Sequence, residues 1–591
     1  MPTASALPRW DIDAIFPGPD SPEFNAEMAA IAQEVANLER QVEESGIGSG
    51  NVADPKGAWE AFEAAYSPLH ERIRTASTYI HMHTNTDSRN EAAQAKESAF
   101  QQIGIRMRKI DNKLTAWIGT LDLDELMAQC RSAREHAYFL HTTKIAATKL
   151  MSPAEEDLAA ELRESGGSAW GKLHGNVSSQ IQVQIGEETL PMPAVRNLAF
   201  DPDPDLRRDA YLAELEAWNR HEVPLAAAMN GIKGEVGRLA KRRGWGSALD
   251  QALFDARIDR ASLEAMMGAA RKFFPAARKY LRAKAKRLGK DRLPWFDLFA
   301  PLPGAVREWA YAKSEDFIEQ VFRGYSDRLA DFARMSYQQS WTDAEPRLGK
   351  RDGGFCVGLR PGESRIFMNF KPAFGSVSTL AHELGHAYHN LCLKDRKPLQ
   401  RGTPMTLAET ASIFCETLIR QAGLREGSEE DRLEILEASI MGSVQTVVDI
   451  SSRFLFESEV FERRAERELS AKELCDIMAK SQTETYGDGL DEAFLHHYMW
   501  AVKPHYYSAG RSFYNFPYMF GLLFGLGLFA IYEKNPDSFR ARYDELLSST
   551  GMFDAAELAK SFDIEIRDEA FWAASLKVIE DDIDRFVELT G

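Results

Sequence analysis

Three residues within one short segment could bind a metal ion and activate water. Residues 379–390 read TLAHELGHAYHN and contain the pattern HExxH at His382, Glu383 and His386. Side chains at positions i and i+4 of a helix lie on the same face, so both imidazoles can bind one Zn²⁺. Glu383 is turned away from that face by one residue and can take a proton from metal-activated water. The pattern therefore predicts a hydrolytic zinc site.

A third protein ligand must come from elsewhere in the chain. The longer pattern HExxHxxGxxH does not continue here, because residue 389 is His and residue 392 is Cys. Glu409 lies 23 residues after His386, which leaves room for a turn and a second helix that packs back. It would complete the His₂Glu set of zinc hydrolases. Because catalytic zinc keeps one position open, His389 is predicted to support or pack rather than to ligate.

Glu416 lies seven residues after Glu409, two turns along the same helix face. It is predicted to accept a hydrogen bond from a ligating histidine and so to orient that ring. A solvated helix face is the alternative, and the apolar residues Ile413, Phe414 and Leu418 beside the two glutamates disfavour it. One Zn²⁺ per chain is the predicted cofactor, although Co²⁺ or Mn²⁺ could occupy the same ligands.

A late segment supplies hydrogen-bond donors. Residues 500–520 read WAVKPHYYSAGRSFYNFPYMF and are dense in His and Tyr. Neutral His and Tyr side chains can stabilise an oxyanion or bind a peptide carbonyl. An aromatic-rich run of this kind is also typical of a hydrophobic core. The candidate donors are His505, Tyr507, Tyr514 and Tyr518.

The elements that must position these residues are mostly helical. Apolar residues recur at three- and four-residue spacing in many segments. These segments are 27–41, 89–113, 205–220, 262–288, 307–340, 406–422, 430–468 and 471–486. Residues 179–185 alternate like a strand, and a turn-rich run after them predicts a boundary near residue 200. Residues 352–370 predict a β-hairpin directly before the HExxH helix.

Composition narrows the class of protein. The 591 residues include 89 acidic and 71 basic side chains, a net charge of −18, which disfavours nucleic-acid binding. The apolar run 513–532 is interrupted by proline and glycines, so a buried core helix is predicted rather than a membrane span. The five cysteines form no CxxC pair, and the N-terminal residues lack a signal-peptide pattern. A cytoplasmic location is therefore expected.

Several ordered motifs together resemble one known family. HELGHAYH, LAETASIFCE and PHYYSAGRSFYNFPYMFGLLFGLGL are similar to the M3 zinc oligopeptidases, in their oligoendopeptidase F branch. LPRWDIDAIFPGPDSPEF and GGSAWGKLHGNVSSQ also resemble that branch, so the similarity spans nearly the whole chain. It implies a mainly α, gluzincin-like fold with a deep substrate channel and a small β-hairpin or sheet beside the active-site helix. Residues 1–200 would cap the channel and residues 201–591 would form the catalytic domain.

The resemblance also implies roles for individual residues and one zinc ion. Sorted by role, these are the metal ligands His382, His386 and Glu409, the base Glu383, the carbonyl-binding pair His505 and Tyr514, and the substrate contacts Tyr507, Tyr518 and Asn369. The strand 365–370 would be the sheet edge along which substrates extend. The expected activity is endopeptidase cleavage of short peptides rather than folded proteins. The segment FKPAFGSVSTL departs from the branch, which leaves the fine specificity open.

Two other functions remain open at this stage. A related helical zinc carboxypeptidase would share HExxH and a downstream glutamate, although the PHYY and FYNFPY motifs argue against it. A non-catalytic peptide-binding protein, or a closed structural zinc site, would not need Glu383 in its present position. Short peptides are the expected partners, with neither nucleic acid nor a membrane, and the oligomeric state is not predicted.

Overall fold

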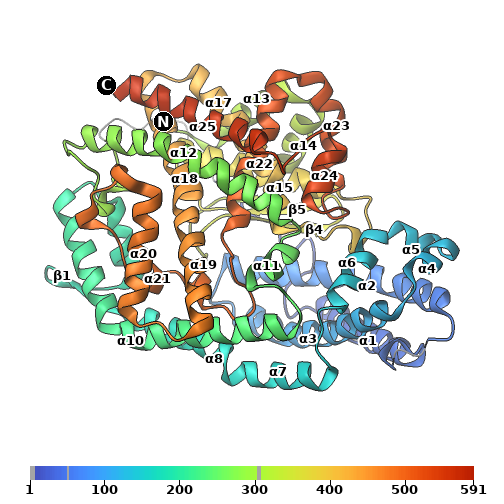
Figure 1. Cartoon of the computed structure of the whole chain (residues 1–591). Helices are drawn as coiled ribbons and strands as arrows, with labels where there is room; N and C mark the ends of the chain where they lie inside the picture. Colours follow the sequence, from blue (N-terminus) through green and yellow to red (C-terminus); the bar gives the residue numbers. More distant parts are fainter. Residues whose placement is uncertain (1–6, 50–51, 303–307, 591) are drawn as a thin grey trace.

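The protein is built mainly from α-helices, as the sequence predicts (Figure 1). The computed structural model describes residues 7–49, 52–302 and 308–590. The expected helix 307–340 begins at a residue outside these ranges. Its described part forms two helices, α13 and α14, which are separated at Ser326.

The first eight helices form the N-terminal region. Polar caps set where several of them begin; Ser21 and Asp54, for example, accept hydrogen bonds from the first-turn N–H groups of α1 and α2. The helices are α1 (Pro22–Glu44), α2 (Pro55–Thr86), α3 (Glu91–Thr120), α4 (Leu123–Gln129), α5 (Arg131–Glu135), α6 (Ala137–Ala147), α7 (Pro153–Ser165) and α8 (Gly167–Gln180).

The remaining helices form the larger part of the molecule. Before the central sheet they are α9 (Met192–Asn197), α10 (Pro204–Arg242), α11 (Ala248–Asp255), α12 (Arg260–Arg287), α13 (Tyr311–Tyr325) and α14 (Asp327–Gln338). After it come α15 (Phe374–Cys392), α16 (Met405–Ala408), α17 (Thr410–Glu426), α18 (Glu429–Val444), α19 (Ile450–Glu466), α20 (Ala471–Tyr486), α21 (Met499–Val502), α22 (Phe516–Lys534), α23 (Pro536–Ser548), α24 (Ala555–Ser561) and α25 (Glu569–Thr590). A π-helical turn, Gln445–Asp449, joins α18 to α19.

Two large clusters of buried apolar side chains make up most of the core of the described chain, and a small third cluster joins Trp10, Met82 and Phe367. The first spans Phe24 to Leu140, and the second spans Ile181 to Phe586. The second cluster already includes Val183 and Val195, so the segment before residue 200 packs with the later helices. The boundary near residue 200 stays a prediction.

A three-stranded sheet stands beside α15. Its strands are β3 (Thr342–Asp343), β4 (Phe355–Arg360) and β5 (Glu363–Phe367), in the order β3-β5-β4. The expected hairpin at 352–370 is confirmed, and Gly362 in its turn has φ 76°, a conformation that favours glycine. The expected edge strand is wrong, because β3 pairs in parallel with the outer side of β5. Within this sheet β4 is the other outer strand, and side chains of α2 cover its edge at Gly358 and Leu359. A separate hairpin, β1 (Gln182–Ile185) and β2 (Glu188–Pro191), lies where the sequence predicts a strand.

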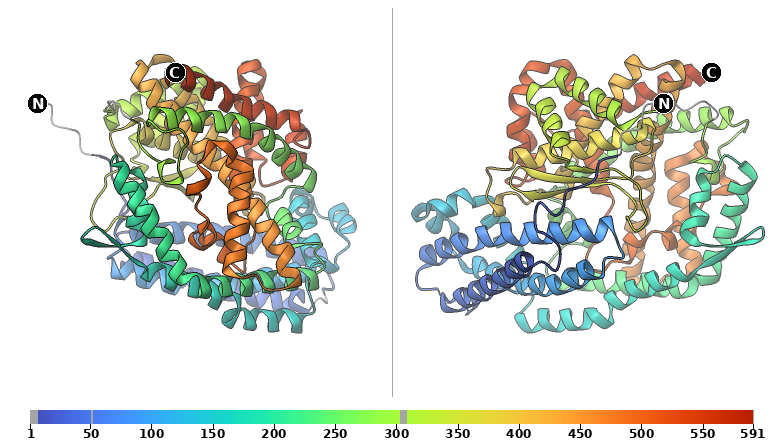
Figure 2. Two further views of the ribbon diagram at one scale, coloured as in Figure 1. Left: turned by 60° about the vertical axis from the view of Figure 1, so that its left-hand side comes forward. Right: turned by 180° about the vertical axis from the view of Figure 1, so that it is seen from behind.

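The sheet and α15 lie in the middle of the molecule. Figure 2 shows the sheet between the N-terminal helices α1–α3 and the lobe that contains α13, α14 and the C-terminal helices. Side chains of α2 contact β4, so the N-terminal region reaches the centre of the fold.

The apolar helix near the C-terminus is a core helix, as predicted. α22 is the one described helix that is long and apolar enough to cross a membrane, and 67% of its most apolar window is buried inside the protein. Its Gly521 and Gly525 lie directly against Glu409 and Ile413, so the GxxxG pattern serves close packing against α16 and α17.

Candidate metal centre and active site

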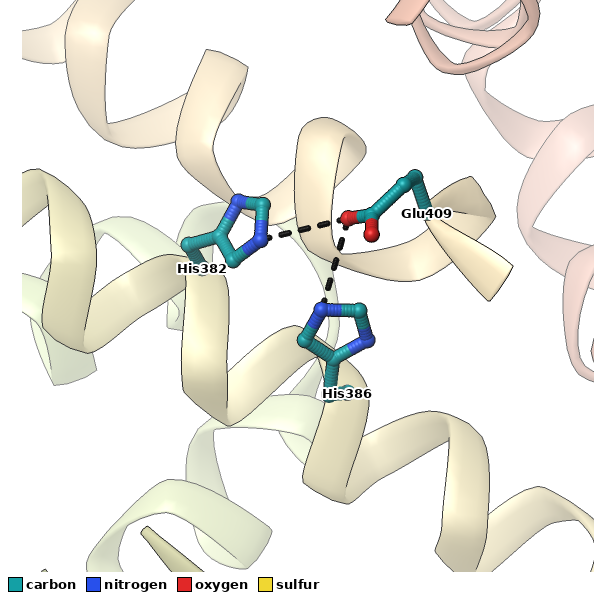
Figure 3. A group of neighbouring side chains, drawn as sticks. All are labelled: His382, His386 and Glu409. Atoms are coloured by element: carbon teal, nitrogen blue, oxygen red, sulfur yellow. Dashed lines mark ion pairs between the residues drawn. The ribbon is translucent and has the colours of Figure 1, made fainter. Parts of the chain in front are cut away.

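His382, His386 and Glu409 come together as the sequence predicts (Figure 3). Glu409 Oε2 lies 3.2 Å from His382 Nε2 and 3.4 Å from His386 Nε2. Two donor atoms that each bind a tetrahedral zinc at about 2.0–2.1 Å lie roughly 3.3 Å apart. Two imidazoles and one carboxylate also match the donor preference of zinc. The three side chains therefore fit a single metal ion.

A close approach of two helices places Glu409 beside the histidines. A Cβ at Gly385 would lie 2.6 Å from the carbonyl oxygen of Ala411, so only glycine lets α15 and α17 approach this far. The sequence predicts one helix across 406–422, but the structure breaks it at Glu409, between α16 and α17. Glu409 thereby turns its carboxylate to the histidines, and Ser412 Oγ donates a hydrogen bond of 2.7 Å to it.

Glu416 contacts the ring nitrogen of His382 that does not face Glu409. Its Oε2 lies 2.9 Å from His382 Nδ1, while Ser378 Oγ donates to its Oε1 at 3.2 Å. A proton on Nδ1 leaves His382 Nε2 free to bind a metal. The geometry is the one predicted for Glu416.

Glu383 is buried beside the metal ligands. Its side chain is 5% exposed, and its Oε2 has no hydrogen-bond partner among the described residues. Burial raises the pKa of the Glu383 carboxyl, and the neighbouring His382 and His386 oppose this shift. The residue lines a cavity of about 620 Å³ together with both histidines, Glu409 and the start of β4. A buried carboxylate that lacks a partner and faces a cavity is suited to accept a proton.

His389 is not placed as a ligand. It is buried, and its Nε2 lies 2.8 Å from Thr550 Oγ1 and 3.1 Å from the Leu547 carbonyl oxygen. Burial lowers the pKa of His389 to about 4, so the ring is neutral. It anchors α15 to the last turn of α23 and to Thr550 just after it, as the prediction of a supporting role requires.

His505, Tyr514 and Tyr518 form one group at the start of α22. The rings of His505 and Tyr514 stack with centroids 4.7 Å apart, and Tyr518 Oη donates a 2.9 Å hydrogen bond to Tyr514 Oη. Tyr518 precedes Gly521 by three residues on α22, and a Cβ at Gly521 would lie 2.8 Å from Glu409 Cβ. The contact of α22 with Glu409 therefore brings Tyr518 near this ligand; burial, the Tyr514 hydrogen bond and the nearby charge of Glu409 raise the pKa of Tyr518.

Tyr507 and Asn369 make their contacts away from the metal ligands. Tyr507 is 5% exposed and stacks on His174 of α8, with ring centroids 3.8 Å apart. Asn369 Nδ2 donates to the carbonyl oxygens of Arg351 and Gly353, so its side chain holds the loop before β4. The structure does not bring either side chain to the metal ligands, and their predicted substrate contacts stay predictions.

A chain of polar residues behind His505 is absent from the site residues predicted from the sequence. Asp449 ends the π-helical turn and forms an ion pair with Arg453. Arg453 Nη1 donates to the side chain of the buried Asn515 at 3.2 Å, and Asn515 adjoins Tyr514 and contacts His505. Burial and the charges of Arg453 and Lys503 lower the pKa of His505. π-Helical turns are often found at functional sites, but no sequence pattern marks this one.

Two arginines in the metal cavity were also missed. Arg74 comes from α2 and donates to the carbonyl oxygen of Gly358, while Arg401 forms an ion pair with Glu71. Both guanidinium groups line the cavity that contains Glu383. The N-terminal region thus supplies part of the cavity wall, which could be inferred only from the tertiary contact of α2 with β4.

The chain matches a known protein family. The family described as Peptidase family M3 matches residues 197–578, which include every candidate ligand. The chain belongs to peptidase family M3. This M3 chain is therefore a peptide-hydrolysing enzyme, and the resemblance read from its motifs is confirmed.

Relatives of this M3 peptidase cover nearly its whole length. It is 22% identical to oligopeptidase PepF of Bacillus subtilis, over 98% of this chain and 87% of the relative. It is 20% identical to an oligoendopeptidase F homologue of Lactococcus lactis subsp. lactis, over 98% and 97%. A crystal structure of a candidate peptidase from Chlamydophila abortus matches with a TM-score of 0.85 at 19% identity, over 98% of both chains. Oligoendopeptidase F from Enterococcus faecium matches at 0.69 and 16%, over 96% and 98%. The chain thus shares its fold with these solved structures over 96–98% of its length.

Proposed function

We propose that this M3 peptidase is a zinc-dependent endopeptidase that cleaves short, unstructured peptides. The observation that carries the proposal is the convergence of His382, His386 and Glu409, with the buried and unpartnered Glu383 beside them. The names of the relatives, which include oligoendopeptidase F, support the same activity.

The catalytic roles follow from the chemistry of these side chains. A zinc ion held by His382, His386 and Glu409 would lower the pKa of water and polarise the substrate carbonyl. Glu383 takes the proton of the attacking water and passes it to the leaving amine. His505 and Tyr514 donate hydrogen bonds to the carbonyl oxygen as negative charge develops there. Tyr518 keeps the Tyr514 hydroxyl in place through its 2.9 Å hydrogen bond.

The edge of β4 offers a backbone template for the substrate. The carbonyl oxygen of Gly358 points away from β5, because it accepts hydrogen bonds from Thr78 and Arg74 of α2. The carbonyl oxygen of the next residue, Leu359, also accepts a hydrogen bond from α2, and the pairing of β4 with β5 is irregular at this end of the strand. Cys356, at the start of β4, lines the metal cavity. An extended peptide paired there binds through its main chain, which suits substrates of varied sequence.

The proposed domain arrangement supports a preference for extended peptides over folded proteins. We place a capping region in residues 1–200 and the catalytic domain in residues 201–591. Arg74 of α2 reaches into the metal cavity from the first of these regions. A cavity with walls from both regions admits an extended chain more readily than a folded protein.

Cleavage of peptides blocked at both ends tests the endopeptidase proposal. We expect an internally quenched peptide, acetylated and amidated, to be cut at an internal bond. A related carboxypeptidase would cut only the unblocked peptide, and a non-catalytic binding protein would cut neither. Metal analysis of the same sample would identify zinc, cobalt or manganese in the site.

A cytoplasmic location is also proposed. All five cysteines are free and three of them are buried, which suits a reducing compartment. The net charge of −18 opposes binding to nucleic acid. Short peptides are therefore the proposed partners.

A further inference from the structure

A second cavity adjoins the one that contains the metal ligands. It has a volume of about 460 Å³, and Gly402 and Thr403 line both cavities. Tyr514, which we assign to carbonyl binding, also lines the second cavity. The two cavities are therefore neighbours, and the second one lies beside the space that a peptide bound at the metal would occupy.

The second cavity carries an excess of positive charge. Its lining arginines are Arg163, Arg243, Arg257 and Arg511, and its one lining carboxylate is Asp255. Arg163 lies 3.7 Å from Glu235, and Arg243 pairs with Glu156 at 2.6 Å. Among the described residues, no carboxylate oxygen lies within 4.0 Å of the guanidinium of Arg257 or Arg511.

Both unpaired arginines are held in place by other contacts. Arg257 has φ 56°, its carbonyl oxygen accepts a 2.9 Å hydrogen bond from Ala555 N, and its guanidinium lies 4.6 Å from the centre of the Phe254 ring. The backbone N–H of Arg511 donates to Ser508 Oγ at 3.2 Å, and its guanidinium lies 5.3 Å from the centre of the Tyr514 ring. Both guanidinium groups therefore lie against aromatic rings, and the Tyr514 ring belongs to the cavity wall.

The backbone of the cavity is strained at two positions. Arg257 and Phe513 both line it, and both adopt positive φ without being glycine. Such conformations are unfavourable for residues other than glycine and cluster at ligand-binding sites. Between Arg511 and Phe513, the buried Ser512 Oγ has no hydrogen-bond partner among the described residues. A hydroxyl donor and two guanidinium groups thus meet in one cavity.

We propose that this cavity is a substrate subsite for a carboxylate group of the bound peptide, which Arg257 and Arg511 hold by charge-assisted hydrogen bonds. The carboxylate belongs either to an acidic side chain or to the peptide's C-terminus. Arg257 and Arg511 carry two positive charges, and Asp255 in the same cavity carries one negative charge. One carboxylate from the substrate would therefore balance the charge of these three side chains. The proposal rests on the proposed peptidase function and adds a preference to it.

Two series of quenched peptides separate the two sources of the carboxylate. In the first series, both ends are blocked and Asp or Asn is placed in turn at each position near the scissile bond. In the second, a neutral peptide carries either a free or an amidated C-terminus at increasing distance from that bond. We expect one position in one series to raise kcat/KM about tenfold over its neutral counterpart, since an opposite charge in a partly buried site is worth about 1.4 kcal/mol.

Variants assign the preference to this cavity. In Arg257→Gln and Arg511→Gln we expect the preference to fall to about twofold, while cleavage of neutral blocked peptides stays within twofold of the parent. Arg208→Gln, an exposed position on α10, is the matched control. Arg511 is exposed in a loop, so its variant remains informative if Arg257→Gln fails to fold.

Binding separates this proposal from the proposed function. The Glu383→Gln protein is titrated with labelled Asp and Asn peptides, so that affinity is measured without cleavage. Tighter binding of the carboxylate peptide, lost with Arg511→Gln in the same background, supports the subsite even if no peptide is cut. Equal affinity for both peptides, or a preference that survives both arginine substitutions, would overturn it.

Discussion

Gly385 of the HExxH helix lies against Ala411 of α17 so closely that a Cβ at 385 would come within 2.6 Å of the Ala411 carbonyl oxygen. This approach of α15 to α17 places Glu409 3.2 Å from His382 and 3.4 Å from His386. Gly385, which lies between the two metal-binding histidines in the sequence, therefore has a packing role that fixes the position of the third ligand.

Gly385→Ala is expected to damage metal binding. The added methyl group must push α15 away from α17, at a cost of about 1–3 kcal/mol for overpacking, and it moves Glu409 away from the histidines. We expect a lower Tm and less bound metal per chain. Gly375→Ala in the same helix is the control, because its Cβ would meet nothing within 4 Å. Equal metal content in the two variants would contradict the packing argument.

Glu416→Gln is expected to weaken metal binding without unfolding the protein. The substitution weakens the acceptor for His382 Nδ1, which the 2.9 Å contact identifies. Loss of such a contact typically reduces metal affinity 10- to 100-fold. Competition with a chelator measures the change, and Glu426→Gln at the end of α17 controls for a charge change on the same helix. Unaltered affinity would mean that Glu416 does not orient the ligand.

Arg453→Met is expected to shift the acid limb of activity. Burial is the main cause of the low pKa of His505, and the charges of Arg453 and Lys503 lower it further, while Asp449 faces Arg453. A lowered pKa keeps His505 neutral as the pH falls. Without Arg453 the pKa rises, so His505 becomes charged at a higher pH.

The pH dependence of kcat/KM measures this shift. Its acid limb should move to higher pH in Arg453→Met and stay in place in Arg463→Met, a change on the same helix. An unmoved limb in Arg453→Met, with kcat/KM reduced equally at every pH, would assign Arg453 a purely structural role.

Removal of the Tyr518 hydroxyl is expected to affect turnover more than binding. In Tyr518→Phe the Tyr514 hydroxyl loses its 2.9 Å hydrogen bond, so it is less well positioned when charge develops on the substrate oxygen. We expect kcat to fall about tenfold with KM nearly unchanged. A rise in KM alone would instead place Tyr518 in ground-state substrate binding.

The two histidine ligands could be predicted from the sequence because they depend on helical periodicity, whereas the helix break that turns Glu409 toward them could not. Residues four positions apart, such as His382 and His386, lie on the same face of any α-helix. Glu416 follows Glu409 by seven residues, which is about two turns. The edge of the sheet could not be predicted in this way. β5 lies inside the sheet because the two residues Thr342 and Asp343 pair with it, and a strand this short leaves no periodic pattern.

The sequence also could not predict which aromatic side chains of residues 500–520 are buried. A short 3₁₀ turn, Pro504–Tyr507, directs Tyr507 toward His174 of α8, which lies more than 300 positions earlier in the chain. The charged residues behind His505 depend on a π-helical turn and on tertiary contacts. Such long-range packing decides which of several similar aromatic residues reaches the cavity.

The role of Glu383 is the central claim, and Glu383→Gln tests it most directly. The measurement is the rate at which this variant cleaves a peptide blocked at both ends, with its metal content determined on the same sample. Because Glu383 is assigned as the base and not as a ligand, we predict wild-type metal content and a rate at least about 100-fold lower. Full activity with the metal retained would contradict the proposed mechanism, and loss of the metal would contradict the assignment of the ligands.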